Sequence, residues 1–165
     1  MSDFLNPQKV INELELQETM SIADFGCGSG GWVIPLARKD KNHMIYALDV
    51  LEPALSALKS NAEMEKVYNI RTIRCDVEKG TGLRDDFLDV VIMSNLLFQV
   101  EDREAVLDEG RRVLRKGGRL VVVDWIIEGD NGEEELDRVI KEKEFGLIKS
   151  INSGESHFAK IYEKI

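Results

Sequence analysis

Residues 21–37 read SIADFGCGSGGWVIPLA, and this stretch decides the fold. Residues 22–25 predict a buried strand, the glycines predict a tight turn, and the apolar residues after them can begin a helix. Because glycine has no Cβ, the backbone of such a turn can approach a bound ligand closely. Taken alone, the pattern Gly26-x-Gly28-x-x-Gly31 also fits a dinucleotide-binding fold.

A carboxylate stands where the predicted strand meets the turn. Asp24 lies two residues before the first glycine. A negative charge at that position would repel a pyrophosphate, whereas it suits a ligand that carries an ammonium and a sulfonium group. The alternative is a glycine-rich turn that binds nothing.

Strand-like and helix-like segments alternate along the rest of the chain. The predicted strands are 22–25, 44–49, 70–76, 89–95 and 119–125, followed by 147–151 and 157–161 as a hairpin around the turn Asn152-Ser153-Gly154. Three predicted helices begin at Pro7, Trp32 and Pro53. A fourth predicted helix is capped by Asp102 and extends through Leu114, before a turn at Gly117-Gly118. A fifth carries Leu136, Val139 and Ile140.

This alternation implies a parallel sheet with right-handed crossovers. We expect an α/β fold of three layers, Rossmann-like, whose seven-stranded sheet is mostly parallel with one antiparallel strand from the C-terminal hairpin. At 165 residues the chain is long enough to bury a sizeable core, so residues 1–165 are expected to form a single domain.

Polar residues fall where the first four predicted strands end: Asp24, Asp49, Asp76 and Asn95. Ligands of such sheets bind at the carboxyl ends of the strands. Asp49 could accept hydrogen bonds from two ribose hydroxyls, and Asp76 from an exocyclic amine, while the amide of Val77 donates to the same ring. The alternatives are a strand-end cap for Asp49, a surface turn at Asp76, and a packing role for Asn95.

The formal charge is −9, from 31 acidic and 22 basic residues. This disfavours a broad nucleic-acid surface, which needs many cationic contacts to phosphate. One basic cluster consists of Arg111, Arg112, Arg115, Lys116 and Arg119. It fits a helix C-terminus that complements its own dipole, and the alternative is a docking site for RNA.

Cys27 and Cys75 are far apart in the sequence and predict free thiols in a reducing compartment. His43 and His157 have no zinc-ligand spacing, so no metal site is expected. The sequence contains no run of about 18 apolar residues, so no membrane span is expected. Residues Met1 to Phe4 lack the basic, then apolar, then small-residue order of a signal peptide. We therefore expect a cytoplasmic protein.

Three motifs in series carry a family resemblance. They are Asp24-x-Gly26-x-Gly28-x-Gly30; Asp89-Val90-Val91-Ile92 followed by Leu97-Phe98-Gln99-Val100; and RVLRKGGRL at 112–120 leading into Asp124-Trp125. Together they resemble the class I S-adenosylmethionine-dependent methyltransferases, nearest the small-molecule branch that includes the quinone-biosynthesis enzymes. The resemblance covers nearly the whole chain.

The resemblance implies S-adenosylmethionine as the cofactor and a small or medium-sized methyl acceptor. It assigns the methionine part to Asp24 and to the turn that includes Gly26, Cys27, Gly28 and Gly30, the ribose to Asp49, the adenine face to Val50 or Leu51, the adenine edge to Asp76 and Val77, and the methyl end to Asn95. Phe98, Asp124 and Trp125 are candidate acceptor contacts. Core packing is the alternative for the two aromatic residues.

Some features depart from the family pattern. Many relatives carry His where Phe98 and Gln99 stand and Pro where Lys116 stands, so an obvious general base is missing. The segments that usually form a lid are short, which suggests an open pocket or one completed by a protein partner or a second copy. Arsenite methylation is not expected, because it needs thiols beyond Cys27 and Cys75. Methylation of nucleobase amines is not expected either, because no Asn-Pro-Pro-Tyr-like motif follows the fourth predicted strand.

Two other functions stay open at this point. One is a non-catalytic S-adenosylmethionine-binding module that serves a partner. The other is a nicotinamide-dependent oxidoreductase, based on Gly26-x-Gly28-x-x-Gly31 with Asp49 downstream. The second is weaker, because no further domain remains to hold a substrate and Asp24 has the wrong charge.

Overall fold

The computed structural model describes residues 5–127, 129, 131–152 and 155–165. Its strands are β1 (Ser21–Phe25), β2 (Met44–Asp49), β3 (Ile70–Arg74), β4 (Leu88–Ser94), β5 (Leu114–Trp125), β6 (Phe145–Asn152) and β7 (His157–Lys164). Its helices are α1 (Pro7–Glu13), α2 (Val33–Lys39), α3 (Glu52–Met64), α4 (Arg103–Val113) and α5 (Gly132–Glu142).

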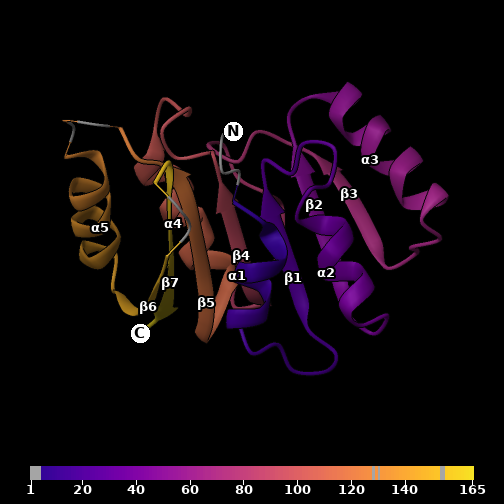
Figure 1. Ribbon diagram of the computed structural model, residues 1–165, viewed down its shortest axis with the longest axis horizontal. Helices are drawn as coiled ribbons and strands as arrows, with labels where there is room; N and C mark the ends of the chain where they lie inside the picture. Colours follow the sequence, from indigo (N-terminus) through magenta and orange to yellow (C-terminus); the bar gives the residue numbers. More distant parts are fainter. Residues whose placement is uncertain (1–4, 128, 130, 153–154) are drawn as a thin grey trace.

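The strands form one seven-stranded sheet in the order β3-β2-β1-β4-β5-β7-β6 (Figure 1). The neighbours from β3 to β5 pair in parallel, and β7 runs antiparallel to both β5 and β6. The predicted α/β fold with one antiparallel strand from a C-terminal hairpin is therefore confirmed. Ser153 and Gly154 of the predicted hairpin turn lie outside the described residues.

Alternating side chains of the sheet supply two separate cores, which gives the molecule three layers. Val121 and Val123 of β5 join a core built with α1, α2 and α3, whereas Leu120 and Val122 join a core built with α4 and α5. Both faces of the central strands are buried, as expected where helices cover a mainly parallel sheet. Among the described residues, none of the helices has the length and apolar character needed to cross a membrane.

The junction of α4 and β5 differs from the prediction. Leu114 is not helical but extended (φ −72°, ψ 135°), and it pairs with Leu88 of β4. The pairing then continues from Arg119 with Val90, so residues 115–118 bulge out between two paired positions of a single strand. The pairing between Leu88 and Leu114 joins residues far apart in sequence, so no local pattern announces it.

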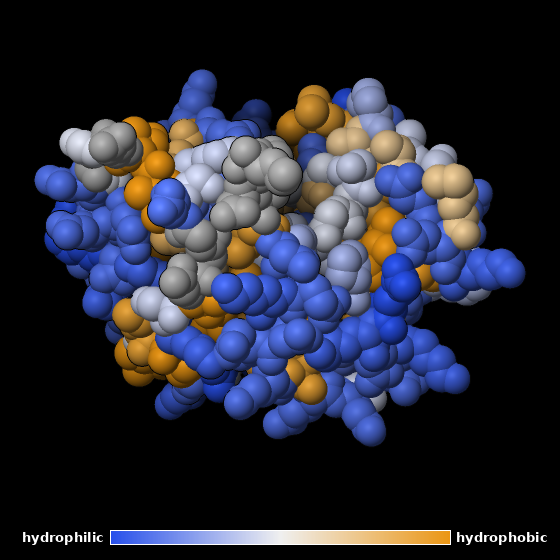
Figure 2. All heavy atoms as spheres, viewed as in Figure 1, coloured by the Kyte–Doolittle hydropathy of each residue, from blue (hydrophilic) through white to orange (hydrophobic). Residues whose placement is uncertain are grey.

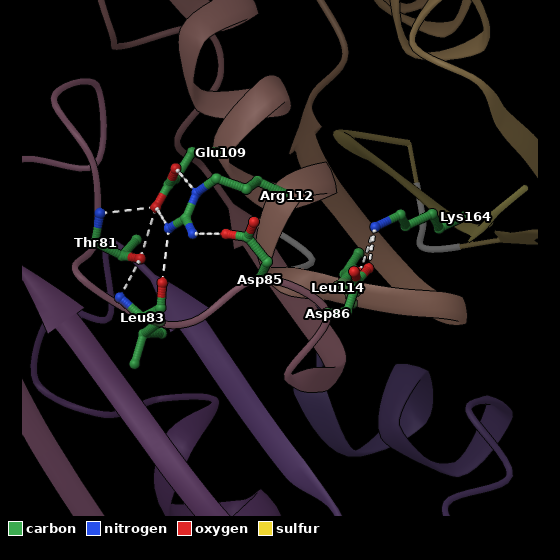
Figure 3. Close-up of polar contacts among 8 residues, drawn as sticks. All are labelled: Thr81, Leu83, Asp85, Asp86, Glu109, Arg112, Leu114 and Lys164. Carbon is green, nitrogen blue, oxygen red and sulfur yellow. Dashed lines mark hydrogen bonds and ion pairs between the residues drawn. The ribbon is translucent and has the colours of Figure 1, made fainter.

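Most of the basic cluster is used inside the fold. Arg112 donates to Glu109 and Asp85 and to the carbonyl of Leu83, while Glu109 also accepts from the amide and hydroxyl of Thr81 (Figure 3). These hydrogen bonds lower the pKa of Glu109 to about 2, with Arg112 the largest cause. The network ties α4 to the loop before β4.

The other arginines of the cluster also meet carboxylates: Arg111 pairs with Glu144, Arg115 with Asp89 and Arg119 with Glu163. Arg111 and Arg112 lie in the last turn of α4, as a dipole-complementing role requires. The other three positions lie on β5, so the prediction of one helix C-terminus was wrong for them.

Candidate functional site

The segments that follow β2, β3 and β4 gather at the carboxyl edge of the sheet, at the top of Figure 1. They enclose a pocket of about 690 Å³. Of the predicted site residues, Gly26, Asp49, Val50, Asp76, Val77 and Asn95 line it. Its size falls within the range of roughly 300–1,000 Å³ that is typical of small-molecule sites.

The glycine turn forms one wall of this pocket through Gly26. The amides of Gly26 and Cys27 both donate to the carbonyl of Leu48, which fastens the turn to β2. Gly30 has φ +99°, and a Cβ there would lie 2.3 Å from Leu58 Cδ1. A Cβ on Gly28, in contrast, would enter open space, so a ligand can approach the backbone at that position.

Gly31, the third glycine of the dinucleotide-type pattern, has no positive φ, and a Cβ there would meet no atom within 4 Å. In dinucleotide-binding folds the third glycine is needed for close packing of helix on strand. Here the glycine whose Cβ would clash is Gly30, against Leu58 of α3, so the spacing of the required glycines does not match the dinucleotide pattern.

Asp24 is the most unusual charged group of the site. Its side chain is 1% exposed, and neither carboxylate oxygen has a hydrogen-bond partner among the described residues. Burial raises the pKa of Asp24 well above its ordinary value, and the nearby charge of Asp49 raises it further. A buried carboxylate without a donor is costly when ionised, so the position calls for a proton or a cation.

Asp49 joins the tip of β2 to the glycine turn. Its Oδ2 accepts from the amide of Gly28 at 2.9 Å, and its Oδ1 accepts from the amide of Leu51 at 2.9 Å. The carboxylate is thereby oriented at the pocket wall by two backbone donors, and each oxygen keeps a further lone pair for a ligand.

The other predicted pocket residues surround Asp49. Val50 and Leu51 are large apolar side chains with 56% and 61% exposure, as expected of a platform that a flat ring can cover. Asp76 accepts from the amide of Glu78 at 3.0 Å and keeps its carboxylate at the pocket. Asn95 has a left-handed backbone (φ +52°), and its Oδ1 has no partner among the described residues.

Cys27 is buried beside this pocket and does not line it. Burial, followed by the charges of Asp24 and Asp49, raises the pKa of its thiol far above the ordinary value. The thiol is thus held protonated, which argues against a nucleophilic role.

Sequence reasoning missed the far wall of the pocket, which consists of Cys75, Glu78, Lys79, Leu96, Gln99, Val100, Glu101 and Asp102; Leu51, predicted with Val50, also lines the pocket. Asp102 was predicted as a helix cap, and its side chain does accept from the amide of Ala105 at 3.0 Å. Its own amide donates to Glu78 at 2.6 Å, which joins the loops after β3 and β4. The one available signal was position, since these residues directly follow strand ends.

The three candidate acceptor residues lie apart from this pocket. Phe98 and Trp125 line a separate cavity of about 40 Å³ together with Ile126 and Ile127. Figure 2 shows apolar residues at the upper left, over the segment between β5 and α5, where these two isoleucines are 41% and 54% exposed. Trp125 also packs on His157, with ring centroids 4.0 Å apart.

Asp124 is buried beneath these residues, with 1% exposure. Its Oδ1 accepts from the amide of Trp125 at 2.9 Å, whereas its Oδ2 has no partner among the described residues. Burial raises the pKa of Asp124, and the amides of Trp125, Phe98 and Leu97 partly offset that rise.

The geometry agrees with a family model. The model described as "Methyltransferase domain" matches residues 23–122. The chain belongs to the class I S-adenosylmethionine-dependent methyltransferases. The matched region contains the glycine turn, the strand-end residues of β1 to β4, and the far wall of the pocket.

Individual relatives match part of their own length to this chain. A ubiquinone/menaquinone biosynthesis C-methyltransferase of Campylobacter jejuni is 31% identical over 122 residues, which cover 72% of this chain and 49% of the relative. A probable cobalt-precorrin-6B C(15)-methyltransferase of Methanosarcina acetivorans is 28% identical, covering 70% of this chain and 60% of the relative. The chain thus spans about half to three-fifths of the length of these relatives.

A solved structure, described as a SAM-dependent methyltransferase from Aquifex aeolicus, has the same fold. It superimposes with a TM-score of 0.85 at 21% identity, covering 99% of this chain and 92% of the other. This likeness confirms the Rossmann-like architecture.

The site fits the family's cofactor, S-adenosylmethionine. Asp24 is a buried acceptor without a donor, the space over Gly28 is open, and carboxylates from two strand ends face the pocket. The described residues contain no group of three or more His, Cys, Asp or Glu side chains arranged to hold a metal ion.

Proposed function

We propose that this chain transfers a methyl group from S-adenosylmethionine to a small or medium-sized acceptor. The observation that carries the proposal is the pairing of a pocket of about 690 Å³ with Asp24, a buried carboxylate whose two oxygens lack any donor among the described residues. An ammonium group on the ligand would satisfy that carboxylate, and its nucleoside would fill the pocket lined by Gly26 and Asp49.

In this proposal Asp24 and the turn of Gly26, Cys27, Gly28 and Gly30 hold the methionine part of the donor. Asp49 accepts from the ribose hydroxyls with the lone pairs that Gly28 and Leu51 leave available. Val50 packs on the adenine, Asp76 and Val77 meet its edge, and Asn95 lies at the methyl end.

S-adenosylmethionine supplies a methyl group that is already activated by its sulfonium. The residues of this chain then have to align the acceptor and exclude water, a task that needs no catalytic triad. Phe98, Trp125 and the buried Asp124 are the proposed acceptor contacts, because Phe98 follows the end of β4, and Asp124 and Trp125 end β5, the neighbour of β4 in the sheet.

The donor half of the proposal is tested by calorimetric titration with S-adenosylhomocysteine and, separately, with NAD. We expect micromolar binding of S-adenosylhomocysteine and no measurable binding of NAD. Tight binding of NAD without binding of the nucleoside would falsify the proposal in favour of an oxidoreductase.

Turnover is tested with donor labelled in its methyl group and a fractionated cell extract. Label is expected in a small-molecule fraction, with none in nucleic acid. If the donor binds and no extract component becomes labelled, the chain is a non-catalytic binding module.

The proposal has three further elements, which concern the domain, a partner and the location. Residues 1–165 form one domain, because a single sheet runs through the described residues. Either a second copy or a protein partner completes the acceptor side, which light scattering with and without extract would test. A cytoplasmic location fits the free thiols Cys27 and Cys75.

A further inference from the structure

We propose that donor binding is coupled to proton release: the ammonium group of the ligand replaces a proton on Asp24. This inference rests on the proposed function and extends it to a regulatory property of the same site. It predicts that the site recognises the amino-acid end of its ligand more strongly as pH rises through the acidic and neutral range.

The geometry of Asp24 carries the argument. Both carboxylate oxygens are buried and unpartnered among the described residues, although the backbone donors of the adjacent turn are close in sequence. The amides of Gly26 and Cys27 are committed to the carbonyl of Leu48, and that of Gly28 is committed to Asp49. These three amides therefore do not replace the hydrogen bonds that the Asp24 carboxylate loses when it is buried away from water.

A second carboxylate strengthens the effect. The charge of Asp49 on β2 adds to the effect of burial and raises the pKa of Asp24, and the charge of Asp24 in turn helps to raise the pKa of the neighbouring Cys27 thiol. Asp49 accepts from two backbone amides, whereas Asp24 accepts from none of the described residues. Of the two neighbouring carboxylates, Asp24 is the one that is buried without a donor, so the proton belongs on Asp24.

The balance of the binding step follows. In the free protein the carboxyl O–H bond of Asp24 is intact. When the ligand enters, that bond breaks, the proton passes to solvent, and the carboxylate then accepts from the ligand's ammonium. The net charge of the buried site does not change, because the ligand brings one ammonium cation for the one carboxylate anion that forms.

The experiment compares two nucleosides that differ at the amino-acid end. S-adenosylhomocysteine carries the ammonium group, and 5′-methylthioadenosine lacks it. Each is titrated calorimetrically at pH 6.5 in two buffers of different ionisation enthalpy, so that the difference in heat gives the number of protons released. The variants are Asp24→Asn and, as a surface control, Asp108→Asn on α4, whose side chain is exposed and pairs with Lys143.

For the unaltered protein we expect about one proton released with S-adenosylhomocysteine and about none with 5′-methylthioadenosine. The ratio of the two affinities should rise by up to about tenfold per pH unit between pH 5 and 7, a measurement that needs no variant. Asp24→Asn should abolish the release and keep the affinity for 5′-methylthioadenosine within threefold, and Asp108→Asn should change neither.

The outcomes separate two kinds of failure. If S-adenosylhomocysteine binds without proton release and with a pH-independent affinity ratio, this inference is wrong and the proposed function stands. If Asp24→Asn still releases the proton, Asp49 or Cys27 is its source and the assignment to Asp24 is overturned. If neither nucleoside binds, the proposed function fails and the inference fails with it.

Discussion

The two halves of the sheet's carboxyl edge are built differently. The donor half extends from β3 to the segment after β4 and holds a pocket of about 690 Å³; Asp24 of β1 is buried just before the glycine turn that lines it, and its two oxygens have no partner among the described residues. At the β4–β5 half the cavity is about 40 Å³, and the equally buried Asp124 accepts from the amide of Trp125. Strand-end residues such as Asp49 and Asn95 line the first cavity, whereas Phe98, Trp125 and the residues that follow β5 line the second.

The largest test of this difference is Asp49→Ala. Removing the carboxylate takes away the proposed ribose acceptor and leaves the amides of Gly28 and Leu51 without their partner. We expect the affinity for S-adenosylhomocysteine, measured by calorimetry, to fall at least about 100-fold, since hydrogen bonds to charged groups contribute roughly 1.5–3 kcal/mol each.

The matched control is Asp124→Asn, which changes a strand-end carboxylate in the other half. Its affinity for S-adenosylhomocysteine should stay within twofold of the unaltered protein. A comparable loss in both variants would show that the two halves bind the donor together and would end the distinction.

The second test concerns the backbone of the donor half. Gly30→Ala places a methyl group 2.3 Å from Leu58 Cδ1 at φ +99°, where L residues are strained. We expect the free energy of unfolding in urea to fall by about 2 kcal/mol, since such backbone strain costs of order 1–3 kcal/mol.

Gly31→Ala is the neighbouring control, because its Cβ meets nothing within 4 Å and its φ is not positive. Its unfolding free energy should change by less than about 0.5 kcal/mol. Equal losses in the two variants would restore Gly31 to the structural role that a dinucleotide fold gives it.

Much of this architecture could be predicted from the sequence, for a physical reason. Strand ends and the glycine turn are encoded locally, by apolar runs that stop at Asp49, near Asp76 and at Asn95, and the parallel topology brings those ends to one edge. Leu114 escaped prediction because its extended state depends on pairing with Leu88, 26 positions earlier in the chain.

The far wall of the pocket escaped for a related reason. Glu78, Gln99 and Glu101 lie in loops whose paths are fixed by contacts such as that of Glu78 with the amide of Asp102. No periodicity marks such residues. The same applies to Phe98 and Trp125, which sequence reasoning joined to a ligand site and which the structure places in a cavity of their own.

The third test addresses the acceptor half through Trp125→Ala. Trp125 is 42% exposed and packs on His157, so its removal opens the small cavity without touching the larger pocket. We expect methyl transfer into labelled extract to fall about tenfold, the loss of roughly 1.4 kcal/mol of acceptor binding, while the affinity for S-adenosylhomocysteine stays within twofold.

Tyr68→Ala provides the control, since Tyr68 is an exposed aromatic residue just before β3 and does not line either cavity. It should leave both quantities unchanged. A loss of donor affinity in Trp125→Ala would mean that the acceptor side also shapes the donor pocket.

The smallest expected effect is on stability, and it has the opposite sign. The folded-state pKa of Asp24 is raised by burial and then by Asp49, so the folded protein binds more protons than the unfolded chain at any pH between the two pKa values. Stability therefore decreases as pH rises from about 4 through that interval, because the unfolded carboxyl ionises there and the folded one does not.

Asp24→Asn removes the ionisable group, so at pH 7 and without ligand we expect its Tm in calorimetry to exceed that of the unaltered protein by roughly 2–4 °C. The difference should vanish below about pH 3, where Asp24 is protonated in both states. A lower Tm at pH 7 would mean that the carboxylate already has a partner in the free protein, and the contrast with Asp124 would then lose its basis.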